Sequence, residues 1–94
     1  MNKLEAEPET VQPKTWYVYI VSASDKTLYT GITTDPKRRL AEHQSGRTGA
    51  KYFRGRTAVE MVYLEASDNR STASIREAAI KKLSRQQKLA LISS

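Results

Sequence analysis

Two runs of mainly apolar, β-forming residues, separated by a polar segment near the start of the chain, predict two neighbouring β-strands. Residues 16–21 are all aromatic or β-branched, and residues 28–32 form a second, shorter run of the same character. The polar residues 22–26 predict a turn, so the two strands are expected to pair as a hairpin. Because side chains alternate between the faces of a strand, a suitable register would place Tyr19 and Tyr29 on one face.

A helix and a third strand are expected next. Asp35 is a favourable N-cap, the following proline suits the first helical position, and the helix is expected to stop near Gly46. A basic loop with glycines and two aromatic residues follows. Residues 58–64 then alternate in hydrophobicity and predict a strand. Simple alternation predicts that three side chains of this strand share one face: Val59, Met61 and Tyr63.

Two helical segments complete the pattern. Residues 72–83 show an apolar stripe at helical spacing, formed by Ile75, Ala79 and Leu83. The segment 84–87 matches a capping box and predicts a short last helix, with Leu89 and Ile92 buried.

The predicted order of elements is β-β-α-β-α-α. This order favours a small α+β domain, with a three-stranded antiparallel sheet flanked by helices. Residues 1–15 mix glutamate, proline and threonine and offer little to bury, so we expect a flexible N-terminal leader and a domain over residues 16–94. A chain of 94 residues suits a single domain.

Composition excludes several classes of site. With no cysteine and one histidine, the sequence holds no disulfide framework, thiol nucleophile, Cys-based zinc site or multi-histidine metal centre. No long apolar run predicts a membrane span, and residues 1–14 lack the apolar core of a signal peptide. The expected location is therefore the cytoplasm.

The charge balance indicates a polyanionic partner. Sixteen Lys and Arg against ten Asp and Glu give a net charge of +6, and residues 37–56 are the most basic stretch. Such a patch on a small domain favours nucleic acid, although a solvated, solubilising surface has the same composition.

The remaining polar residues suit the hydrolysis of a phosphodiester. Arginine can neutralise the charge that develops in the transition state, a carboxylate can hold Mg²⁺, and some base must take a proton from water. Arg39 and His43 lie four residues apart and therefore share one face of their helix.

The order of these residues resembles the GIY-YIG endonuclease superfamily. Tyr17-Val18-Tyr19 and Tyr29-Thr30-Gly31 stand as the two name-giving triplets, Arg39 and His43 follow at the family's spacing, and Arg76-Glu77 matches the later glutamate helix. The resemblance extends from about Trp16 to Ile92 and is strongest to small, stand-alone bacterial members. The sequence departs from the pattern at Tyr17, Val18, Thr30 and Ile32, and it has no evident match to a terminal asparagine.

This resemblance implies a metal-dependent endonuclease that acts on DNA, in repair or in the processing of structured DNA. Mg²⁺, or Mn²⁺ in its place, is expected on Glu77, and Arg39 is expected to clamp the phosphate. Tyr19 would help to activate water and Tyr29 would orient water or phosphate, with the identity of the base left open. His43 would hydrogen-bond to the phosphate or to a site tyrosine.

Further nucleic-acid contacts are expected around this centre. Gly31 would leave room for substrate, and four cations are candidates for phosphate binding: Arg38, Lys51, Arg54 and Arg56. Tyr52 and Phe53 would stack on bases or, alternatively, pack onto the sheet.

Each of these assignments has a structural alternative. The two tyrosines could be ordinary strand aromatics, Arg38 could pair with Glu42, and Glu77, expected to point away from the stripe of its helix, could pair with Lys81. The alternative function is a non-catalytic nucleic-acid-binding module that keeps the fold. RNA and DNA are not distinguished.

Overall fold

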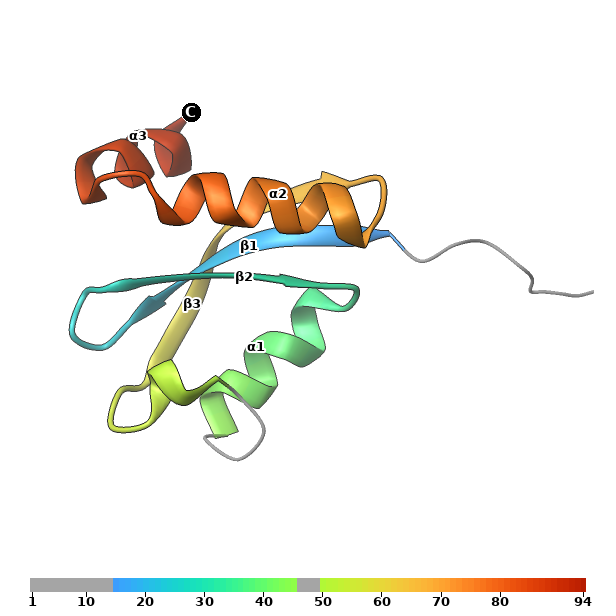
Figure 1. Ribbon diagram of the computed structural model, residues 1–94. Coiled ribbons are helices and arrows are strands. Elements are labelled where there is room, and N and C mark those ends of the chain that lie inside the picture. The colour runs from blue at the N-terminus through green and yellow to red at the C-terminus, as the bar shows by residue number, and fades with distance from the viewer. Residues whose placement is uncertain (1–14, 46–49) are drawn as a thin grey trace, which may run out of the picture.

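A three-stranded antiparallel sheet with helices on both faces makes up the computed structural model, which describes residues 15–45 and 50–94 (Figure 1). The strands lie in the order β2-β1-β3, with β1 in the centre. The elements along the chain are β1 (Trp16–Ala23), β2 (Leu28–Thr33), α1 (Pro36–Ser45), the short 3₁₀ helix η2 (Lys51–Phe53), β3 (Ala58–Ser67), α2 (Arg70–Lys81) and α3 (Arg85–Ser93). The predicted α+β class, the antiparallel sheet and the β-β-α-β-α-α order are confirmed.

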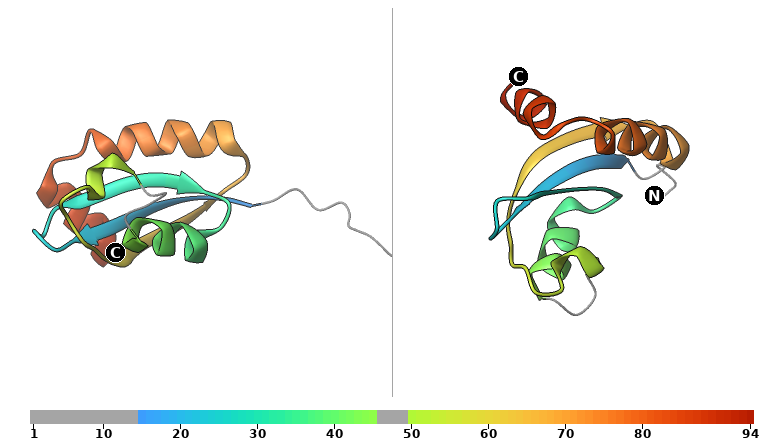
Figure 2. Two further views of the ribbon diagram at one scale, coloured as in Figure 1. Left: turned by 90° about the horizontal axis from the view of Figure 1, so that it is seen from below. Right: turned by 60° about the vertical axis from the view of Figure 1, so that its left-hand side comes forward.

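The two faces of the sheet carry different helices (Figure 2). α1 and η2 lie on one side, and α2 and α3 lie on the other. The expected leader, residues 1–15, lies outside the described ranges except for its last residue. The expected helix end at Gly46 also lies outside them, and α1 extends to Ser45. No helix in residues 15–45 or 50–94 is long and apolar enough to cross a membrane.

The hairpin has the register that brings the two tyrosines together. Tyr19 lies opposite Gly31 and Val21 lies opposite Tyr29, so Tyr19 and Tyr29 are diagonal neighbours on the α1 side. Val18 and Ile20 point to the α2 side, where both are fully buried. The predicted alternation along β1 is therefore confirmed.

A β-bulge changes the faces of β3. Ile20 pairs with Tyr63 but Val21 pairs with Met61, so one extra residue of β3 is inserted between them. As a result Met61 packs in the cluster on the α1 side, whereas Tyr63 packs in the cluster on the α2 side. The prediction that Val59, Met61 and Tyr63 share a face is wrong, because simple alternation does not anticipate an inserted residue. The strand also continues three residues beyond the expected end.

The rotation of α2 differs from the predicted one. Its buried residues are Ala73 and Ile80, while Ile75 is 69% exposed. A capping box between Asn69 and Thr72 starts the helix two residues before the expected position. Glu77, four residues after Ala73 and three before Ile80, therefore lies along the sheet-facing stripe, not away from it.

A polar cluster holds this rotation of α2 against β3. Tyr63 donates its hydroxyl hydrogen to Glu65 Oε1 at 2.5 Å, and Arg76 Nε donates to Glu65 Oε2 at 3.0 Å. Arg76 Nη2 adds a bond to Glu65 Oε1 at 3.2 Å. Such a planar pairing specifies orientation as well as contact, and Arg76 immediately precedes Glu77.

The last helix begins as predicted, with a capping box between Ser84 and Gln87. Its apolar contacts with the α2-side cluster come from Leu91 and Ile92. Leu89, expected to be buried, is 42% exposed.

The observed rotation of α2 can be tested with a matched pair of substitutions. We expect Ile80→Ala to lower the free energy of unfolding by about 2–5 kcal/mol, because it leaves a cavity in the core. Ile75→Ala should change it by no more than about 0.5 kcal/mol, because that side chain faces solvent. Urea unfolding followed by circular dichroism measures both values. A larger loss of stability in Ile75→Ala than in Ile80→Ala would favour the stripe predicted from the sequence and contradict the observed rotation.

Candidate active site

Tyr19 reaches across the sheet over Gly31. An added Cβ at Gly31 would lie 2.5 Å from Tyr19 Oη and 2.7 Å from Cζ, closer than real Cβ contacts. The ring therefore runs from the central strand towards β2, which forms one edge of the sheet. A glycine is needed here because any side chain would displace the tyrosine. The sequence analysis expected Gly31 to leave room for substrate, whereas in the structure the Tyr19 ring occupies that room.

A buried hydrogen bond joins Tyr19 to α1. Tyr19 Oη and His43 Nε2 are 2.7 Å apart, and both side chains are about 1% exposed. The backbone N–H of Ala50 donates to His43 Nδ1 at 3.3 Å. Because a neutral imidazole carries one proton, this bond leaves the proton on Nε2, where it is donated to Tyr19 Oη.

The environment of His43 keeps it neutral. Burial, followed by the nearby positive charge of Arg39, lowers the pKa of His43 to about 4, against a smaller opposite effect of Glu42. At neutral pH the His43 ring is therefore uncharged, and it donates a hydrogen bond from Nε2 to Tyr19 Oη.

Arg39 lies on the same face of α1 and forms an ion pair with Glu42, from Nη1 to Oε1 at 2.8 Å. The expected pair between Arg38 and Glu42 is longer, at 3.9 Å, and Arg38 is largely exposed. Glu42 therefore orients Arg39 more closely than Arg38, and the sequence had not indicated this role for Glu42.

Several neighbouring groups affect the pKa of Tyr19. Burial raises it to about 12, hydrogen bonding and charge from Arg39 oppose the rise, and the charges of Tyr29 and Glu77 add to it. Residues from β1, β2, α1 and α2 thus act on a single hydroxyl. Tyr19, Tyr29, Arg39, His43 and Glu77 are the five residues that the sequence nominated.

Aromatic rings form the wall of the site. The ring of Tyr29 lies 5.3 Å from His43, 5.4 Å from Phe53 and 5.2 Å from Tyr52, measured between centroids. Phe53 is buried in the core on this side and packs on His43. Base stacking by Phe53 is therefore wrong, and packing onto the sheet is correct. Two aromatic residues inside a basic loop were the available signal for this wall.

Glu77 is the acidic residue of the site. Its side chain is 22% exposed, and its Oε2 lies 3.2 Å from Lys81 Nζ. Within residues 15–45 and 50–94 no three His, Asp or Glu side chains cluster as a metal-binding group. A cation here would have one protein carboxylate, and this fits Mg²⁺, which retains several waters and takes further oxygens from a substrate phosphate.

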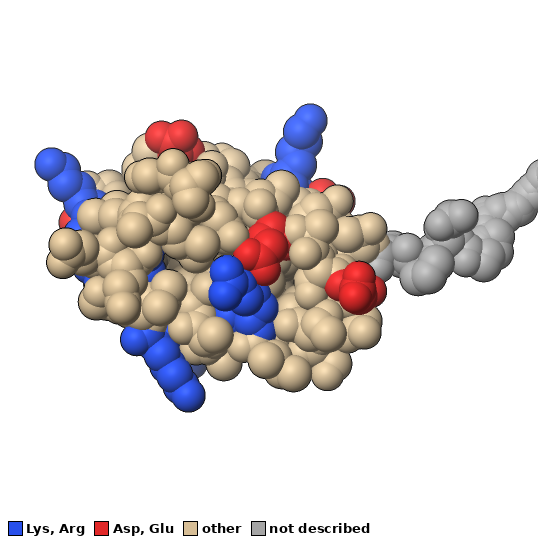
Figure 3. Space-filling view, turned by 90° about the horizontal axis from the view of Figure 1, so that it is seen from above, with Lys and Arg blue, Asp and Glu red and all other residues tan. Residues whose placement is uncertain are grey.

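The basic loop residues divide into two kinds. Lys51 and Arg54 are exposed. Arg56 instead donates from Nε to Asp25 at 2.7 Å and lies over the Tyr52 ring at 4.3 Å, so its charge is already partnered. Viewed from the α2 side, Lys and Arg are scattered among acidic and uncharged side chains rather than gathered in one continuous patch (Figure 3).

Comparison with known proteins shows the family of this chain. The family model of the GIY-YIG catalytic domain matches residues 15–90. A UPF0213 protein of Desulfotalea psychrophila is 52% identical over 98% of this chain and 82% of its own length. One from Natronomonas pharaonis is 55% identical over 81% of this chain and 88% of its own.

Solved structures show the same fold. The solution structure of a protein from E. faecalis has 44% identity and a TM-score of 0.58, over 86% of this chain and 85% of that one. A UPF0213 protein from Bacillus halodurans has 43% identity and a TM-score of 0.54, over 84% and 83%.

The close approach at Gly31 predicts a coupled effect. Gly31→Ala should destabilise the protein by about 1–3 kcal/mol, because the new methyl group must displace the Tyr19 ring. The same change made on a Tyr19→Leu background should cost less, since the crowded ring atoms are gone. Urea unfolding of the four proteins gives the coupling. Equal costs on both backgrounds would mean that the tyrosine does not cover Gly31.

Burial of neutral His43 predicts a pH dependence of stability. In the unfolded chain this histidine takes up a proton near pH 6.5, whereas in the folded state it does so only near pH 4. Its contribution is therefore present above pH 6.5 and is lost as the pH falls towards 4, by up to ~1.4 kcal/mol per pH unit. Urea unfolding of wild type and His43→Gln from pH 7 to pH 4.5 measures it. The difference between the two proteins should shrink on acidification; a constant difference would contradict a neutral buried histidine.

Proposed function

Because the chain belongs to the GIY-YIG catalytic domain family, we propose that it is an Mg²⁺-dependent endonuclease that hydrolyses phosphodiester bonds in DNA. The observation that carries the proposal is the buried 2.7 Å hydrogen bond between Tyr19 and His43, beside Arg39 and within the field of Glu77. One partner would satisfy a buried phenol, whereas both His43 and Arg39 act on the Tyr19 hydroxyl. By resemblance to the family, the biological setting is DNA repair or the processing of structured DNA.

Tyr19 and Tyr29 are the groups that manage the proton of the attacking water. With a pKa raised to about 12, Tyr19 is a neutral phenol in the free protein at neutral pH. The N–H of His43 and the guanidinium of Arg39 both favour its ionised form. His43 is therefore a positioning residue that acts through Tyr19, and it does not supply a proton from an imidazolium.

Arg39 supplies positive charge to the phosphate. Its side chain is 28% exposed, so it reaches solvent while Glu42 orients it. A preoriented guanidinium of this kind stabilises the additional negative charge of a pentacovalent phosphorus more than that of the ground state.

Glu77 is the residue that would hold the metal, with Mn²⁺ able to replace Mg²⁺. Its carboxylate is partly accessible, and an incoming cation can displace Lys81 from the ion pair that the two side chains form. When bound, the ion supplies positive charge beside the phosphate and offsets the Glu77 charge that raises the pKa of Tyr19.

Plasmid nicking tests this proposal. Purified protein should convert supercoiled DNA to open circles with Mg²⁺ or Mn²⁺ and not with EDTA. Tyr19→Phe should lower the rate by about 10²–10⁴-fold, as loss of a proton-transfer group does. Glu77→Gln should reduce nicking to background.

Lys81→Gln is the matched control, because it breaks the same ion pair but keeps the carboxylate. It should retain nicking near the wild-type rate. Activity that survives EDTA or Glu77→Gln would contradict a metal at Glu77. DNA binding without cleavage under all conditions would favour the non-catalytic binding module.

A further inference from the structure

A hollow lies beside the candidate active site, at the start of β2. The hairpin tip, η2 and α3 surround about 240 Å³ of space. Its lining residues are Thr27, Leu28, Tyr52, Arg85 and Lys88. Two of these five carry positive charge and none is acidic, so the hollow favours an anion.

One wall of this hollow is shared with the active site. The ring of Tyr52 lies 5.2 Å from that of Tyr29, and Leu28 directly precedes Tyr29 in β2. A chain molecule held at Tyr29 therefore reaches the hollow by following the outer edge of the sheet. Successive phosphates of a duplex strand rise about 3.4 Å each, so only a few nucleotides are needed.

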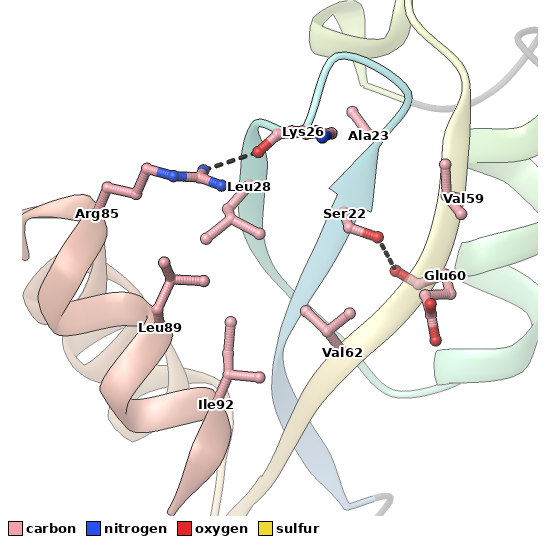
Figure 4. A pocket seen from close by; sticks show the side chains of 10 residues that line it. All are labelled: Ser22, Ala23, Lys26, Leu28, Val59, Glu60, Val62, Arg85, Leu89 and Ile92. Carbon is pink, nitrogen blue, oxygen red and sulfur yellow. Dashed lines mark hydrogen bonds between the residues drawn. The ribbon is translucent and has the colours of Figure 1, made fainter.

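Arg85 is held at the hollow by the hairpin. Its Nη1 donates to the carbonyl of Lys26 at 2.7 Å (Figure 4). A guanidinium has five N–H donors, so this bond orients the group without exhausting it.

Lys88 lies three residues further along α3 and is half-buried. No carboxylate in residues 15–45 or 50–94 forms an ion pair with it, and α3 itself contains no acidic residue. Its charge is thus available to a ligand, while its stem helps to form the wall.

The neighbouring hollow has different chemistry. On the other side of Leu28 and Arg85, about 370 Å³ is lined mainly by apolar side chains, with Glu60 at its margin (Figure 4). This space also has two cations, Lys26 and Arg85, but the carboxylate of Glu60 offsets one of the two charges. The distinction confines the anion site to the Tyr52 side of α3.

We propose that the hollow between η2 and α3 binds the sugar–phosphate backbone of a DNA strand, outside the site of cleavage. Arg85 and Lys88 contact phosphate, and Leu28 and Tyr52 pack against the sugar or base. The inference rests on the proposed function only in that DNA is the ligand; it does not require that the DNA be cut. It assigns α3 a binding role and sets the path of the strand along β2.

Binding measured without metal tests the assignment separately from catalysis. Fluorescence anisotropy with a short labelled DNA oligonucleotide in EDTA gives Kd as a function of salt. Lys88→Gln should weaken binding several-fold and reduce the slope of log Kd against log salt by about 0.7–0.9, the loss of one phosphate contact. Lys88→Arg should retain the slope.

Arg70→Gln is the charge-matched control, since Arg70 is exposed near Trp16 at the opposite end of β1. It should leave the slope nearly unchanged. Equal losses in Lys88→Gln and Arg70→Gln would overturn the site and leave only an effect of net charge. If Lys88→Gln binds as wild type does, this inference fails while the nuclease proposal stands. If wild type binds no DNA in EDTA, this inference also fails, and the nicking assay decides the nuclease proposal separately.

Amide NMR separates a strand from a small anion. The oligonucleotide should shift the resonances of Thr27, Leu28 and Lys88 at concentrations where inorganic phosphate does not. Equal shifts with phosphate alone would overturn the strand path.

Discussion

The hydrogen bond between Tyr19 and His43 is the interaction on which the rest of the site depends. It crosses from the central strand to α1 inside the core, so it requires a glycine beneath the ring and a neutral imidazole at its end. The Ala50 N–H completes the arrangement by selecting the tautomer. Because each polar group is buried, losing one partner would leave another unsatisfied, and the cluster holds a single geometry.

The sheet supplies the precision that this bond needs. Tyr19 and Tyr29 become neighbours through one hairpin register, and a shift by one residue would send one of them to the opposite face. On the other face, the Tyr63–Glu65–Arg76 cluster orients α2, which also carries Glu77. Rigid elements thus position the groups of the site on both sides of the β2 edge, while the basic loop contributes its aromatic wall.

The cations of the basic loop have different roles. Arg56 is paired with Asp25 and packs on Tyr52, so it supports the loop, whereas exposed Lys51 and Arg54 face solvent. The net charge of +6 therefore does not show which cations are placed to meet a polyanion. Arg85 and Lys88 are distinguished by their place on α3 beside the start of β2, and not by the density of charge in the sequence around them.

The sequence by itself determined the class of fold, the alternation of β1 and the caps at Asp35 and Ser84, and it nominated five candidate site residues. These depend on local patterns and on the spacing of a recognisable set of residues. Only the tertiary structure decided the bulge in β3, the rotation of α2 and the burial of Phe53. Several faces of α2 satisfy the helical period, and only packing against the sheet selects Ala73 and Ile80 over Ile75. The same packing turns Glu77 towards the sheet, because side-chain orientation depends on contacts between segments distant in sequence.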